Sequence, residues 1–297
     1  MITSSLSQLA RQEKTRREIL HKSDLVPPLP DLVSRLLELL GGQDTEPRDL
    51  EELLRNDQVL VAKMLAMVNS PFYGLNRPVC TIKEAVMVLG FRGVRSLVLA
   101  TGTAKLLQRD FGAYGHEPRG LWRHAVCVAA SARRLALGCG LPRDDAEQLF
   151  VSGLLHDIGK LLLVAYVQAG PAPLGARSVA EHERATVGLD HAEAGALVTA
   201  KWNLSREIQQ VIGAHHAGAP AGDLDPTTAK AAAVVRLADA AAHATGIGYA
   251  DGCAPPGAVD GADLAALGLD EPQWARVELE LTTTMEEAVA ALGDLGS

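Results

Sequence analysis

The stretch LLHDIGKLLL, residues 154–163, places three ionisable side chains inside an apolar run. His156 and Asp157 are adjacent, and Lys160 follows His156 by four residues. Burying such groups among leucines costs free energy unless partners compensate them. In a helix, residues i and i+4 share a face, so His156 and Lys160 would point the same way. The stretch therefore predicts a polar site inside a hydrophobic core.

The rest of the sequence predicts helices as well. Apolar residues recur at helical spacing along most of the 297 residues, and no alternating strand pattern is convincing. Four pairs have the spacing of a capping box, with a glutamate three residues after a polar residue: Thr81 with Glu84, Asp144 with Glu147, Ser178 with Glu181 and Asp190 with Glu193. Helices are expected over residues 31–40, 48–55, 57–68, 82–90, 92–107, 122–137, 144–167 and 205–216, and from 226 and about 272 onward.

The segment RDFGAYGHEPRG, residues 109–120, interrupts this pattern with glycine and proline. We place a lobe boundary there, between an N-terminal lobe of residues 1–112 and a second lobe of residues 113–297. The expected fold is all-α, with the N-terminal helical lobe packed on the second. In the first lobe, the rings of NSPFYG, residues 69–74, are expected to fill the space between the lobes rather than to contact a partner.

Charge and composition exclude several classes of protein. The net charge of −8 argues against a broad grip on nucleic acid and against attraction to anionic lipid. The four cysteines are far apart and form no C-x-x-C pair, which is typical of reduced thiols in the cytosol. The first residues contain no apolar segment of a signal peptide. We therefore expect a cytoplasmic protein that binds neither nucleic acid nor a membrane.

Other ligand-type side chains lie on separate helices of the second lobe. A single histidine on an apolar helix is usually a structural residue, and a single aspartate is usually solvated. Their occurrence together favours a metal site, because imidazole and carboxylate suit divalent first-row metals. Asp157 could bridge two ions, an arrangement that activates water against phosphate esters. Besides His156 and Asp157, the candidate ligands are His124, His191, His215, His216 and Asp239.

The order of these residues resembles that of the HD superfamily of metal-dependent phosphohydrolases. Three segments are more specific: LVPPLPDLVSRLLELL, the run from LLRNDQVLVAKML to GVRSLVLA, and GLLHDIGKLLL. They resemble the HDOD family, the HD-related output domain of bacterial signalling proteins. The resemblance covers residues 22–216, with Asp239 just beyond. It implies an all-helical bacterial protein with an N-terminal helical lobe packed on an HD-type lobe.

The chemistry of the side chains suggests a role for each candidate. One metal would be held by His124, His156, Asp157 and Asp239. A second would be held by Asp157, His191 and one or both of His215 and His216. The expected ions are Fe, Mn, Zn or Ni, one or two per chain. Lys160 would contact a phosphate oxygen, although an ion pair with a nearby acid is an equal alternative. His21, His116, His182 and His243 remain surface or structural residues, and His243 could support Asp239 from one turn away.

The histidine order and Lys160 also resemble the HD-GYP branch, which hydrolyses cyclic di-GMP. The sequence departs from that branch, since AGAPAGDLD follows His216 in place of a Gly-Tyr-Pro signature. Gly120 also occupies a position where that branch often carries an acidic ligand.

Two functions remain open. One is a signalling protein that carries a metal site and regulates through contacts with a protein partner. The other is an active metal-dependent phosphohydrolase, with Lys160 and Asp157 as catalytic residues, acting on a nucleotide or cyclic dinucleotide.

Overall fold

The computed structural model of the protein describes residues 12–19, 26–42, 44–167, 178–216 and 224–293. His21 lies outside these ranges. Within them the chain is helical, and the β-type pairing consists of a single antiparallel bridge between His116 and Tyr249. The all-α fold expected from the sequence is confirmed.

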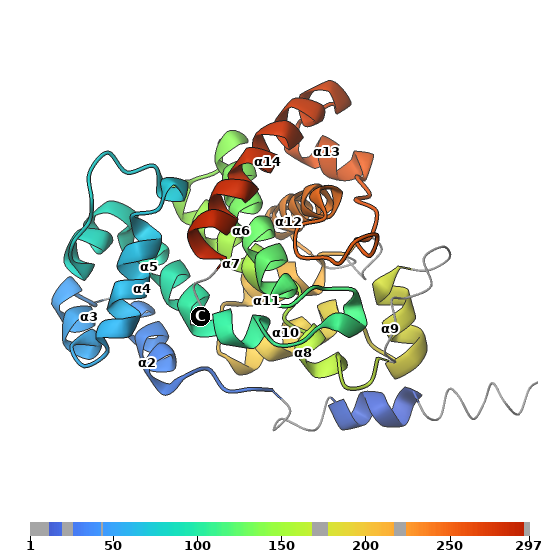
Figure 1. Ribbon diagram of the computed structural model, residues 1–297, viewed down its shortest axis with the longest axis horizontal. Coiled ribbons are helices and arrows are strands. Elements are labelled where there is room, and N and C mark those ends of the chain that lie inside the picture. Colours follow the sequence, from blue (N-terminus) through green and yellow to red (C-terminus); the bar gives the residue numbers. More distant parts are fainter. Residues whose placement is uncertain (1–11, 20–25, 43, 168–177, 217–223, 294–297) are drawn as a thin grey trace, which may run out of the picture.

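The N-terminal lobe is a small group of helices at one side of the molecule (Figure 1). The longest of them, α5, packs against each of the other three helices, α2, α3 and α4. These elements are α2 (Asp31–Leu40), α3 (Pro47–Leu54), α4 (Gln58–Val68), the short 3₁₀ helix η2 (Pro71–Tyr73) and α5 (Ile82–Leu107).

The second lobe is organised around α6, which packs on α7, α12 and α14. Helices α10 and α11 also pack on each other, and α11 packs on α7 and α12. The elements are η3 (Gly112–Tyr114), α6 (Gly120–Gly138), α7 (Arg143–Leu155), α8 (Lys160–Leu163), α9 (Val179–Val187), α10 (His191–Lys201), α11 (Arg206–Gly213), α12 (Pro226–Thr245), α13 (Gly261–Leu267) and α14 (Glu271–Leu292).

One hydrophobic core runs through both lobes. Leu36 and Leu97 of the first lobe belong to the same buried cluster as Phe150, Ile212 and Leu292 of the second. Helix α5 packs directly on α7 and so joins the two halves of this core. The apolar faces of the N-terminal helices are therefore covered partly by the second lobe.

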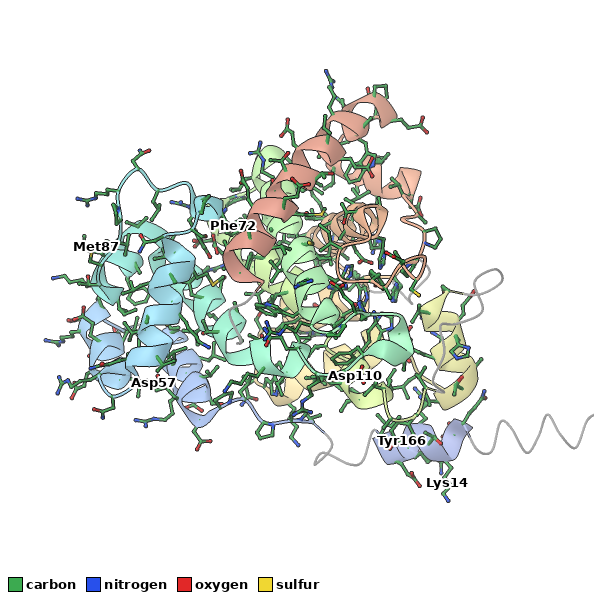
Figure 2. The ribbon with its side chains drawn as sticks, in the orientation of Figure 1. Lys14, Asp57, Phe72, Met87, Asp110 and Tyr166 are labelled. Carbon is green, nitrogen blue, oxygen red and sulfur yellow. The ribbon has the colours of Figure 1, made fainter. Side chains whose placement is uncertain are left out.

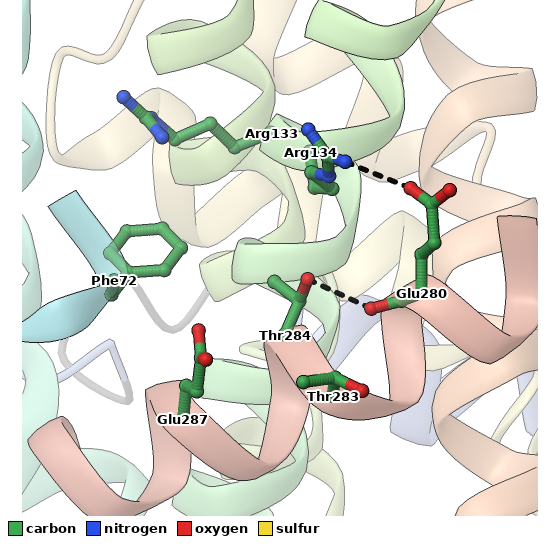
Figure 3. Close-up of a pocket in the computed structure, with 7 residues that line it drawn as sticks. All are labelled: Phe72, Arg133, Arg134, Glu280, Thr283, Thr284 and Glu287. Carbon is green, nitrogen blue, oxygen red and sulfur yellow. Dashed lines mark hydrogen bonds and ion pairs between the residues drawn. The ribbon is translucent and has the colours of Figure 1, made fainter. Parts of the chain in front are cut away.

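The aromatic pair of η2 lies at the contact between the lobes, as the sequence suggested. Figure 2 labels Phe72 on η2, which packs on α14, and Figure 3 shows its ring facing the guanidinium of Arg133. The Phe72 ring is 5.8 Å from that of Phe150, and the Arg133 guanidinium lies 5.3 Å from the rings of both Phe72 and Tyr73. Arg133 in turn donates to Glu147 at 2.7 Å. Glu147 is therefore an ion-pair partner, and the expected capping box with Asp144 does not form.

Helix α5 is the most apolar long helix of the described residues. By length and composition it is able to cross a membrane, but 56% of its most apolar window is buried inside the protein. Its burial identifies it as a core helix. Gly90 interrupts it with a φ of +72°, so the sequence correctly placed a helix end at this glycine, although a second helical segment follows directly.

The prediction of one continuous helix over residues 144–167 is wrong in its second half. Helix α7 ends at Leu155, and tight i→i+3 turns carry the chain through His156 and Asp157 to α8. The segment is packed closely against α10, because an added Cβ at Gly159 would collide with the carbonyl oxygen of His191. The break turns His156 and Asp157 toward the neighbouring helices.

A fragment of residues 1–112 is expected to be aggregated or molten, because it loses the part of the shared core that the second lobe supplies. Gel filtration and near-UV circular dichroism would test this, with the full chain as the control. A soluble monomer that unfolds cooperatively would contradict the shared-core interpretation.

Candidate metal centre

All seven ligand candidates meet at one place in the second lobe. Helix α6 carries His124, the turn after α7 carries the His156–Asp157 pair, and α12 carries Asp239. His191 is the first residue of α10, and the His215–His216 pair follows the end of α11. The centre is enclosed, since these residues are buried except for the half-buried His216.

Four of these residues form a first donor group, which we call site A: His124, His156, Asp157 and Asp239. The Nε2 atom of His124 lies 3.0 Å from Oδ1 of Asp239 and 3.9 Å from Oδ2 of Asp157. The Nε2 atom of His156 lies 3.4 Å from Oδ2 of Asp157 and 3.5 Å from Oδ1 of Asp239. These donors surround one point with two imidazoles and two carboxylates.

A second donor group, site B, adjoins the first and consists of Asp157, His191, His215 and His216. Nε2 of His191 lies 3.1 Å from Oδ1 of Asp157 and 2.7 Å from Nε2 of His216. Ligand atoms of His191, His215 and His216 lie within 4.8 Å of one another. The two oxygens of Asp157 therefore face different groups, Oδ2 toward site A and Oδ1 toward site B.

Hydrogen bonds at Nδ1 fix the orientation of three rings. The Nδ1 atoms of His156 and His215 donate to the carbonyl oxygens of Gly153 and Ile212, at 2.7 and 2.6 Å. Nδ1 of His191 donates to Glu183 at 2.6 Å. A donating Nδ1 leaves a lone pair on Nε2 of a neutral imidazole, which is the usual arrangement of histidines that bind metals.

The residues fit metal ions, because without a cation several acceptor atoms face one another. Nε2 of His215 is buried and has no hydrogen-bond partner among the described residues. Burial opposes protonation of His156 and His191, but the adjacent carboxylates outweigh it and raise their pKa values to about 10 and about 9. A metal ion would take the place of these protons.

Lys160 contacts the carboxylate of Asp157. Its Nζ donates to Oδ2 of Asp157 at 2.6 Å, so the structure contains the ion pair that the sequence left as one alternative. Burial opposes ionisation of Asp157, but Lys160 and His156 outweigh it and hold the pKa of that carboxyl well below its usual value. Asp157 is therefore ionised at neutral pH.

The sequence analysis missed Glu183, a fully buried carboxylate on α9. Its Oε2 accepts from the backbone N–H and the Nδ1 of His191, at 2.8 and 2.6 Å, and its Oε1 accepts from the Tyr114 hydroxyl at 2.8 Å. Only Glu181 of this helix had a recognisable role, as a cap. Nothing in the local pattern marks Glu183, because its partners come from distant segments.

His116 and His243, which the sequence left as surface or structural residues, lie beside site A. His116 is buried, stacks on Tyr249 with ring centres 4.2 Å apart, and donates from Nδ1 to the carbonyl oxygen of Gly248. Burial lowers the pKa of His243 to about 4, although Asp239 acts in the opposite direction. His243 lies on α12 itself, and His116 lies between η3 and α6.

Glu183→Gln is expected to weaken metal binding at site B by about 10–100-fold, the usual effect of removing a group that orients a ligand. Glutamine keeps the size of the side chain but replaces the charged acceptor of the His191 Nδ1–H. Titration of the metal-free protein with Zn²⁺ against a chelator measures the change, and Glu181→Gln on the same helix is the matched control. Equal affinity in the two variants would remove Glu183 from the site.

Comparison with known proteins identifies the family of the chain. Residues 26–218, more than half of the chain, match the model of the HDOD domain. A protein of Treponema pallidum (strain Nichols) without a characterised function is 30% identical over 217 residues, which are 69% of this chain. The match spans only 41% of that relative.

Solved structures extend the similarity over nearly the whole chain. An HDOD domain protein of unknown function from Geobacter sulfurreducens has a TM-score of 0.72 and 25% identity, covering 96% of this chain and 98% of its own. A candidate phosphohydrolase from Shewanella amazonensis SB2B has a TM-score of 0.69 and 25% identity, covering 94% and 98%. The matched domain model ends at residue 218, before α12, which supplies Asp239.

Proposed function

Because the chain belongs to the HDOD domain family, we propose that it is a bacterial signalling protein whose second lobe holds two divalent transition-metal ions. It regulates through contacts with a protein partner in the cytoplasm. The observation that carries the proposal is the position of Asp157, whose two oxygens face two separate donor groups. A carboxylate between two sets of histidines is the arrangement expected of a bridging ligand.

The donor set suits Fe, Mn, Zn or Ni. Site A offers two imidazoles and two carboxylates, and site B offers three imidazoles and the shared carboxylate. Nitrogen and carboxylate oxygen together select these ions over Mg²⁺ and Ca²⁺, which prefer oxygen alone. When bound, such ions supply positive charge that polarises phosphate oxygens and lowers the pKa of water.

Burial of the centre favours a regulatory role. His124, His156 and Asp157 are at most 2% exposed, and Lys160 is occupied by its ion pair with Asp157. The ligands come from α6, α10, α12 and the ends of α7 and α11, so bound metal would tie these elements together. Metal binding of this kind adds directly to folding stability. It would keep the lobe in one shape for a partner to recognise.

Phosphohydrolysis is the second candidate function, and the complete ligand set favours it. A module that binds only partners has no need to keep every donor of two adjoining sites. In this role, Asp157 would hold its position between the sites, and Lys160 would turn its ammonium from Asp157 to an oxygen of a bound phosphate. The substrate would be a nucleotide or a cyclic dinucleotide.

The two candidate functions predict different effects of metal loading: the regulatory one predicts a gain in stability without hydrolysis, and the hydrolytic one predicts turnover. We expect Mn²⁺ or Zn²⁺ to raise the unfolding temperature of the wild type. The rise is expected to be smaller for His215→Ala. We expect no hydrolysis by the loaded wild type in a panel of nucleotides, cyclic dinucleotides and simple phosphodiesters. Metal-dependent turnover that His215→Ala abolishes would replace the regulatory proposal with the hydrolytic one.

A further inference from the structure

His243 lies where a further ligand of site A would lie. It is on α12, one turn after Asp239, and its Nε2 is 3.6 Å from Oδ1 of that aspartate. Its ring is parallel to that of His124 within 16°, with ring centres 4.9 Å apart. The potential ligand atoms, one from each residue, lie within 4.8 Å of one another in the group formed by His124, Asp239 and His243. Two donors bound about 2.0–2.2 Å from one ion are at most roughly 4.4 Å apart, so the 3.6 Å distance fits a shared ion.

The hydrogen bond of His243 shows which atom it presents. Its Nε2 lies 3.1 Å from the hydroxyl oxygen of Tyr249. When Nε2 is unprotonated it accepts from the phenol, and because this nitrogen has a single lone pair, a metal ion bound at Nε2 would take the place of that hydrogen bond. The side chain is 15% exposed, which allows Nδ1 to keep its proton at the edge of the site.

The loop of residues 246–250 is held by other contacts, so a structural role does not account for His243. Within this loop, the Gly248 carbonyl accepts from the backbone N–H of Glu117 at 3.2 Å and from the His116 ring at 3.0 Å. The Ala250 N–H donates to Gly115 at 2.9 Å. The bond between His243 and Tyr249 is therefore not needed to fix the loop.

Gly120 closes the nearby first turn of α6 to any ligand. An added Cβ at Gly120 would collide with the carbonyl oxygen of Gly248. No side chain can therefore enter the centre from this position, which is four residues before His124. The remaining space beside His124 is occupied by the rings of His243 and Tyr249.

We propose that His243 is a fifth protein ligand of the metal in site A, alongside His124, His156, Asp157 and Asp239. This inference rests on the proposed metal binding and adds a residue to it. Site A then has five protein donors and site B has four, and site B includes the half-buried His216. An anion from solution, such as inorganic phosphate, would bind at site B.

The test is a titration of the metal-free protein with Co²⁺ alone, followed by its visible absorption and by competition with a chelator. We expect wild type to bind two ions. His243→Gln is expected to bind one of them at least about 100-fold more weakly, beyond the roughly 10–100-fold typical of an orienting group. Its absorption is expected to change, because one ion loses a nitrogen donor.

Two matched variants separate a ligand from a loop contact. Tyr249→Phe removes the hydroxyl that meets His243, and His116→Gln disturbs the same loop without removing any proposed ligand. Both are expected to keep the affinity and absorption of wild type. This inference alone would be overturned if Tyr249→Phe lost as much Co²⁺ affinity as His243→Gln. It would also be overturned if His243→Gln bound Co²⁺ as wild type does. A wild type that binds no Co²⁺ would overturn the metal proposal as well.

Discussion

Asp157→Ala is expected to reduce the metal content of the protein from two ions per chain to nearly none. Asp157 is the only residue shared by sites A and B, so its loss removes a donor from both. It also leaves His156 and His191 without the carboxylate that each faces at 3.4 and 3.1 Å. Elemental analysis after metal loading measures the change, and His182→Ala, on α9 outside both groups, is the control.

A folding defect could imitate this result, because Asp157→Ala leaves the buried Lys160 ammonium without its partner. Asp157→Asn combined with Lys160→Met removes both charges and keeps the volume of both side chains. This double variant is expected to unfold cooperatively and still to lose both metals. If it retains two ions with wild-type affinity, Asp157 is not the bridge.

Lys160→Met is expected to give the opposite result, with both metals retained. A protonated lysine has no lone pair, so it does not ligate, and its contact with Asp157 is through hydrogen bonding and charge. If the protein hydrolyses a phosphate ester, the same variant should lose about 10²–10³ in turnover, as expected when one group that stabilises transition-state charge is removed.

His156→Ala is the matched comparison, since it removes a ligand one turn before Lys160. It should lose metal and any turnover together. Loss of both metals from Lys160→Met would contradict the assignment and would make the Asp157–Lys160 ion pair part of the metal-binding structure itself.

The convergence of the candidate ligands was predictable because histidine and aspartate stand out in helices that are otherwise apolar. His156 and Asp157 interrupt a run of leucines, and a buried pair of this kind needs partners. Asp239 likewise lies in an alanine-rich helix, and the other residues from 237 to 242 are apolar. The sequence could therefore identify which residues converge, although not how the two oxygens of Asp157 divide between the sites.

The residues that support the ligands were not predictable in the same way. Glu183 contacts His191 and Tyr114, which are 8 and 69 residues away along the chain. His116 is tied to Gly248 at a separation of 132 residues. Such contacts arise only when the helices pack, and a lone histidine or glutamate in a helical segment gives no sign of them.

The end of α7 illustrates the same limit in the fold. The periodicity of residues 144–167 continues without a break, and it predicted one helix. In the structure α7 ends at Leu155, and Gly159 packs against the backbone of α10, a contact between distant segments that the local pattern does not contain. The break at Gly90 was predictable because glycine commonly ends a helix with a positive φ.

Metal content of the wild-type protein tests the central claim most directly. The protein should be purified without chelator, supplemented with Fe, Mn, Zn or Ni, freed of loosely bound ions and analysed for metal per chain. The two donor groups that share Asp157 predict two ions per chain for at least one of these metals. A wild type that retains none of them after supplementation would contradict the account.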